Sequence, residues 1–169
     1  KKDTGKKPVF NPKNFKVLSE QIESGKTPWM ALHPFTLEGK MQDARIGSVY
    51  LAHKTGAKII PAALETHGEG GALIGPKDLG KRLIGRIKGS ANATYHIGEA
   101  MDLPELDVSI IEKVLKKREI KERISSEERK QFKETHEKLK EEADQIARKI
   151  AEMLPEEQRG SYYESTIAD

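Results

Sequence analysis

The sequence has no cysteine, and only 5% of its 169 residues are aromatic. The absence of cysteine excludes disulfides, thiolate metal sites and cysteine nucleophiles. The five histidines lack a metal-binding spacing such as His-Glu-x-x-His, so we expect no metal, and nothing in the sequence calls for a cofactor. No apolar run approaches the roughly 18 residues of a transmembrane helix, and no signal peptide opens the chain. We therefore expect a cytoplasmic protein that is soluble or peripherally bound to a membrane.

The sequence has an excess of charged residues. They make up 34% of the chain, against about 25% in a typical domain. Bases dominate residues 1–60, which hold 11 of them against 5 acids. A basic stretch favours phosphate-bearing partners or an anionic membrane surface, although the lysines of residues 1–7 are simply typical of a solvated chain end. Nucleic acid is not expected as a partner, because no aromatic residues are interleaved with the lysines and no binding motif is present.

Hydrophobic spacing predicts alternating helices and strands along the first half of the chain. Helices are expected at residues 12–24 and 44–55, and strands at residues 29–33, 58–64, 84–87 and 93–97. Helices that alternate with strands are typical of crossovers between parallel strands. The predicted fold class is therefore α/β, with a mixed, largely parallel sheet flanked by helices.

A long, highly charged helix is predicted at residues 126–153. The sequence Ser125-Ser126-Glu127-Glu128 is typical of a helix N-cap, and Pro155 ends the helix. Its narrow apolar stripe consists of Phe132, Leu139, Ile146, Ile150 and Met153. The stripe covers too few heptads for a convincing coiled coil, so we expect it to pack on the α/β body. The expected organisation is a flexible basic start (1–11), an α/β domain (12–105), a helical extension (106–160) and a tail (161–169).

The loop after the first predicted strand is the richest candidate site, because ligands bind beyond the carboxyl ends of parallel strands. Four residues separate His33 from Glu38, and in such a dyad the carboxylate would orient the imidazole for proton abstraction. Composition alone predicts roughly one pair with this spacing, and His136 with Glu141 forms a second one. A structural histidine at the mouth of the sheet is therefore the alternative interpretation of His33.

Several other side chains are interpreted as structural. His53 is expected to be exposed near a helix end, and His96 to have a hydrogen-bonded role on a strand. Trp29 is expected in the core, with an acyl-facing or membrane-facing position as the alternative. Lys40 and Arg45 are interpreted as functional. Lys40 precedes the predicted helix at residues 44–55 and Arg45 lies at its start, where the N-terminal dipole would help them to hold a phosphate.

Short motifs occur in a particular order along the chain. They are Glu38-Gly39-Lys40-Met41, Arg45-Ile46-Gly47, Leu51-Ala52, Ile60-Pro61, Tyr95-His96-Ile97-Gly98-Glu99-Ala100 and a tail of Leu154-Pro155, Arg159-Gly160 and Tyr162. This order resembles the C-terminal part of the glycerolipid (lysophospholipid) acyltransferases of the bacterial 1-acylglycerol-3-phosphate acyltransferase type. The resemblance covers roughly residues 12–162.

The resemblance implies an enzyme of phospholipid biosynthesis that lies peripherally on the cytoplasmic face of the inner membrane. It implies direct transfer of a fatty acyl group from acyl-CoA or acyl-ACP, the acylated acyl carrier protein, to a lysophospholipid or glycerol phosphate hydroxyl. Under this resemblance His33 and Glu38 are the catalytic candidates. The substrate-binding candidates are Pro34, Thr36, Gly39, Lys40, Arg45 and Pro61.

The sequence departs from the family in two respects. Pro34, Thr36, Glu38 and Gly39 are residue types of the family's third block, but its consecutive Pro-Glu-Gly-Thr order is lost. The family has a His-x4-Asp block well upstream of these motifs, whereas residues 1–32 contain no histidine. We therefore expect the chain to be the C-terminal portion of the enzyme, an incomplete acyltransferase fold that is inactive alone. The alternative is a non-catalytic α/β module that binds lipid headgroups or a protein through its basic N-terminal third and its long helix.

Overall fold

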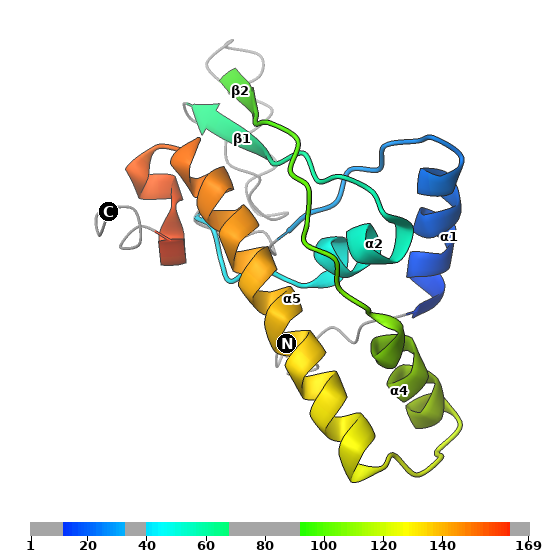
Figure 1. Cartoon of the computed structure of the whole chain (residues 1–169). Helices are drawn as coiled ribbons and strands as arrows, with labels where there is room; N and C mark the ends of the chain where they lie inside the picture. Colours follow the sequence, from blue (N-terminus) through cyan, green and yellow to red (C-terminus); the bar gives the residue numbers. More distant parts are fainter. Residues whose placement is uncertain (1–11, 33–39, 68–91, 163–169) are drawn as a thin grey trace, which may run out of the picture.

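The computed structural model describes residues 12–32, 40–67 and 92–162. The elements in these ranges are helices α1 (Pro12–Glu23) and α2 (Gly47–Thr55), strands β1 (Ala62–His67) and β2 (Asn92–Ile97), helices α4 (Ser109–Glu119) and α5 (Ser126–Glu152), and the short 3-10 helices η2 (Glu156–Gln158) and η3 (Gly160–Tyr162). Helix α5 runs along the molecule, with α4 beside its N-terminal half and the strands near its C-terminal end (Figure 1).

The helices predicted at residues 12–24 and 126–153 are confirmed as α1 and α5. The helix predicted at residues 44–55 begins only at Gly47. The backbone before it is held by tertiary contacts, since the Ala44 amide donates to the Tyr162 hydroxyl and the Arg45 amide to the Leu32 carbonyl. These bonds fix an irregular segment where the hydrophobic period alone predicted another helical turn.

The mixture of helices and strands is confirmed, but the expected parallel pairing is not found among the described strands. β1 and β2 are antiparallel, in a register that runs from Ala62 opposite Ile97 to His67 opposite Asn92. The described part of the strand expected at residues 29–33, residues 29–32, forms no strand, so within the described ranges neither α1 nor α2 connects two parallel strands. Trp29 in that segment is 75% exposed and is not a core residue.

The second predicted strand, at residues 58–64, is shifted along the chain. β1 begins at Ala62, and before it only Ile59 forms an isolated bridge, with Met101. Pro61 has no amide hydrogen to donate to a ladder, which delays the start of regular pairing. The strand predicted at residues 93–97 is confirmed as β2, whereas the one predicted at 84–87 lies outside the described residues.

The core is centred on the apolar face of α5. Leu139 and Ile146 are almost completely buried, and they belong to one cluster with Val49 of α2, Ala63 of β1 and Ile111 of α4. The apolar stripe predicted on the long helix therefore packs within the chain, as expected. Because α5 contacts elements from both halves of the sequence, it fixes the position of α2 and of the segment that precedes it.

The start of α5 is a capping box, as its sequence predicted. The Ser125 hydroxyl accepts from the Glu128 amide, and the Glu128 carboxylate accepts from the Ser125 amide at 2.9 Å. Glu128 also contacts Lys117 and Lys113 of α4. The Ser125 amide first, and then these two ammonium groups, lower the pKa of Glu128 to about 2.

This lowered pKa predicts a loss of stability in acid that depends on Glu128. A carboxyl group whose pKa is lower in the folded state stabilises the fold above its ordinary pKa of 4.5, and the contribution disappears as the pH falls from there toward 2. Glu128→Gln keeps a capping side chain but should flatten the fall in melting temperature over this pH interval. The control is Glu127→Gln, which changes the exposed neighbour. Parallel pH profiles for wild type and Glu128→Gln would contradict the prediction.

Candidate functional site

The candidate loop is closed at its base by one backbone hydrogen bond. The Arg45 amide donates to the Leu32 carbonyl at 2.7 Å, so the chain leaves and re-enters the body at neighbouring points. Five predicted site residues between these points lie outside the described residues: His33, Pro34, Thr36, Glu38 and Gly39. The structure therefore describes Lys40, Arg45 and Pro61 of the predicted set, together with what holds the segment that follows the loop.

The C-terminal tail packs directly on this segment. The Met41 amide donates to the Gln158 carbonyl at 3.0 Å, and the Ser161 amide approaches the Met41 carbonyl at 3.4 Å. Between these bonds lies Gly160, with φ of +54°, where an added Cβ would stand 2.0 Å from the Met41 carbonyl oxygen. Only glycine fits this close approach, so the tail and the segment are in direct backbone contact.

A partly buried polar network holds the next residues of the segment. The Ala44 amide donates to the Tyr162 hydroxyl at 2.8 Å, and that hydroxyl donates to the Asp144 carboxylate, also at 2.8 Å. Lys140 bridges the same groups, because its ammonium donates to the Ala44 carbonyl at 3.2 Å and to Asp144 at 2.7 Å. Both backbone polar groups of Ala44 are thus satisfied by side chains from α5 and η3.

The chemistry of Tyr162 suits this positioning role. Burial first, and then the neighbouring Asp144 carboxylate, raise the pKa of Tyr162 to about 12. The hydroxyl therefore stays protonated through the physiological range and keeps its proton for Asp144 while it accepts from the Ala44 amide. The turn behind it is closed by Arg159, whose Nε donates to the Leu154 carbonyl at 2.9 Å.

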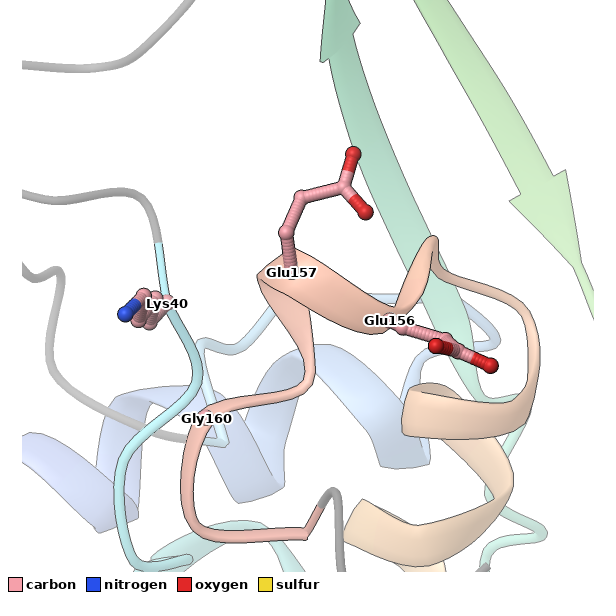
Figure 2. Close-up of a pocket in the computed structure, with 4 residues that line it drawn as sticks. All are labelled: Lys40, Glu156, Glu157 and Gly160. Atoms are coloured by element: carbon pink, nitrogen blue, oxygen red, sulfur yellow. The ribbon is translucent and has the colours of Figure 1, made fainter.

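Lys40 lines a shallow hollow between the segment and the tail. The hollow has a volume of about 440 Å³ and is also lined by Glu156, Glu157 and Gly160. In Figure 2, Lys40 comes from the segment after the loop, the two glutamates come from η2, and the three side chains point in different directions. The hollow is open to solvent and is not an enclosed pocket.

Arg45 lies close to the N-terminus of α2, in line with its predicted place. Its side chain is exposed, and α2 begins two residues later at Gly47. Amides in the first turn of a helix have no acceptor within the helix and attract anions. The hydroxyl of Ser48, in this first turn, is buried and has no hydrogen-bond partner within the described ranges. A guanidinium, first-turn amides and a hydroxyl without a partner among the described residues therefore occur within four residues.

Pro61 has a structural position away from these groups. It is buried immediately before β1, its carbonyl accepts from the Gly98 amide at 2.9 Å, and its ring would lie 3.0 Å from a Cβ added at Gly98. The contacts of Pro61 support a role in ending the hairpin.

Two histidines outside the loop make carboxylate pairs. His96 Nε2 lies 2.7 Å from Glu65 Oε2 across the strands, which confirms its predicted structural role. The exposed position predicted for His53 is wrong, because its side chain is only 4% exposed and its Nε2 lies 2.5 Å from Glu142 Oε2 of α5. Within the described ranges, no group of three or more histidine, cysteine or acidic residues is arranged to hold a metal ion.

Sequence reasoning assigned no role to Tyr162, Asp144 or Lys140. Only Tyr162 carried a signal, as part of the tail motif.

The helices among the described residues include none that is both long and apolar enough to cross a bilayer. Comparison of the chain with protein-family profiles, curated proteins and solved structures found no match.

Proposed function

We propose that the chain is the C-terminal part of a glycerophospholipid acyltransferase that works at the cytoplasmic face of a membrane. One observation carries the proposal: two motifs of the resemblance that lie more than 100 residues apart in the sequence meet in space. The tail residue Gly160 packs on Met41 of the loop motif, and the tail residue Tyr162 binds the backbone of Ala44. By holding residues 41–44, the tail fixes the segment beside the candidate catalytic loop. This contact explains why the loop motif and the tail motif occur in the same chain.

If His33, and not the family's upstream His-x4-Asp block, is the base, His33 removes the proton of the acceptor hydroxyl and Glu38 orients the imidazole. The acceptor oxygen attacks the thioester carbonyl of acyl-CoA or acyl-ACP, the C–S bond breaks, and the departing thiolate takes up the proton from His33. The acyl group is transferred directly, without a covalent acyl-enzyme intermediate. Pro34, Thr36 and Gly39 would shape the loop around the acceptor.

We place the acceptor phosphate beside Arg45 at the N-terminus of α2. Helix N-termini bind phosphate through their free amides, and a guanidinium adds a charge-assisted bond. The exposed side chain of Arg45, two residues before α2 begins, supports this placement. Lys40 would contribute at the far end of the segment.

Binding of glycerol 3-phosphate tests this placement on the chain itself. In NMR titrations we expect the largest shifts in the amides of residues 45–49. Arg45→Gln should weaken binding roughly tenfold, the usual scale for one hydrogen bond to a charged group. Lys149→Gln removes an exposed base of α5 and is the matched control. Equal affinities for the two variants, or shifts centred elsewhere, would contradict the placement.

Acyl transfer itself is best measured on the protein encoded by the whole reading frame. A thioester donor and a lysophospholipid acceptor are supplied, with His33→Ala in parallel. Equal rates in wild type and variant would remove His33 as the base. Headgroup binding without any transfer by the whole product would instead favour the non-catalytic lipid-binding module.

A further inference from the structure

The charges of the α4–α5 hairpin are strongly polarised along its length. Residues 113–133, at the end where the two helices are joined, hold nine bases and four acids. Residues 134–162, along the rest of α5 and the tail, hold five bases and eight acids. The chain's small net charge of +3 therefore conceals a basic end on this hairpin, which we call the basic tip (residues 113–133).

Part of this charge is used within the protein, and part is not. Lys113 and Lys117 contact Glu128, and Arg118 lies over the Phe132 ring at 5.0 Å. Four exposed bases of the basic tip have no side-chain partner in the part of the chain that the structure describes: Lys116, Lys121, Arg123 and Arg129. These four bases can bind an anion without first breaking an ion pair within the described part of the protein.

An exposed apolar residue sits among the free bases. Ile120 is 61% exposed where α4 ends, next to Lys121 and one helical turn after Lys116. The basic tip is also the part of the hairpin farthest from the strands in Figure 1, so it projects from the body. A projecting end with lysines around an isoleucine combines electrostatic attraction with an apolar group for insertion.

We propose that the basic tip binds an anionic phospholipid bilayer, with Ile120 at the level of the headgroups. Charge complementarity favours this partner, and a fluid surface does not require the concave shape that a folded partner would. A protein or nucleic-acid partner would be expected to meet a groove or stacking aromatics, and Phe132, the aromatic residue of the tip, is covered by Arg118. The inference deepens the proposed function, because a lysophospholipid acceptor resides in a membrane.

Vesicle sedimentation tests the inference without measuring acyl transfer, so either proposal can fail alone. The probes are phosphatidylcholine vesicles with and without phosphatidylglycerol. The tip variant is Lys116→Gln/Lys121→Gln/Arg123→Gln. The control variant, Lys26→Gln/Lys138→Gln/Lys149→Gln, removes three exposed bases elsewhere and changes the net charge equally. Circular dichroism establishes that both variants are folded.

We expect the wild type to bind only the anionic vesicles. Each base near an anionic leaflet strengthens binding roughly fivefold, so the tip variant should bind on the order of 100-fold more weakly, while the control changes much less. Raising the salt from about 0.1 M to about 1 M should abolish binding, because it shortens the screening length from about 10 Å to about 3 Å. Ile120→Ser should weaken binding without changing its salt dependence.

Three results would overturn the inference. The first is equal weakening by the tip and control variants, and the second is equal binding of the wild type to neutral and anionic vesicles. The third is retention on immobilised polyglutamate without sedimentation on anionic vesicles, which would reassign the basic tip to an acidic protein partner.

Discussion

Gly160→Ala is expected to lower the free energy of unfolding by roughly 3 kcal/mol or more. Two effects combine at this position. The backbone has φ of +54°, which disfavours any L side chain, and the new methyl carbon would stand 2.0 Å from the Met41 carbonyl oxygen. Because the colliding atoms belong to the backbone, the tail has to move away from the segment that it holds. Urea denaturation measures the loss, and hydrogen exchange of the Met41 and Ala44 amides should report the opening.

Gly56→Ala separates the two effects. Gly56 also has a positive φ, of +67°, but nothing lies within 4 Å of an added Cβ. Its substitution should therefore cost only the conformational strain, about 1 kcal/mol, and should leave exchange at Met41 and Ala44 unchanged. If the two alanine variants were equally stable, the backbone contact between tail and segment would not be a major source of stability.

His53→Leu is expected to destabilise the protein by about 3 kcal/mol, because it leaves the Glu142 carboxylate buried without its partner. The Glu142 side chain is only 11% exposed and lies 2.5 Å from His53 in the native structure. The pair joins α2 to α5, so its loss also weakens the packing that positions the start of α2. Thermal or urea unfolding at neutral pH measures the effect.

The double variant His53→Leu/Glu142→Leu tests whether the unpaired carboxylate is the cause. Replacing both partners by apolar residues removes the unsatisfied charge, so the double variant should be more stable than His53→Leu alone. Glu141→Leu, at the exposed neighbour of Glu142, should change stability by about 0.5 kcal/mol or less. A double variant less stable than His53→Leu would show that packing volume, and not charge, dominates at this position.

Local signals in the sequence predicted local structure well. The capping box of Ser125 and Glu128 depends on residues three positions apart, and its bonds form as the motif predicts. The apolar stripe of α5 predicted its buried face, because 3.6-residue periodicity belongs to the helix itself. The strand expected from Trp29 failed for the opposite reason: a short apolar run between prolines has no intrinsic strand geometry, and it found no partner strand.

The candidate site was less predictable because its fixed part depends on long-range contacts. Arg45 was placed correctly near the start of a helix from the adjacent sequence alone. The bonds from Ala44 to Tyr162 and Lys140 join positions about 100 residues apart or more, and no spacing rule relates them. His53 was misjudged likewise, because a histidine in the last turn of a helix is exposed unless another helix covers it, and here α5 does so.

The contact between Gly160 and Met41 has a consequence for the order of events during synthesis. The segment after the candidate loop emerges early from the ribosome, but the residues that hold its backbone are made 118 positions later, with Tyr162. The partner of the Ala44 carbonyl, Lys140, is made 96 positions after Ala44, and the partner of the Ala44 amide only when Tyr162 is made. The backbone contacts of the segment are therefore complete only after the tail is translated, and a ribosome that stalls before Tyr162 carries a chain in which the Ala44 amide lacks its native partner.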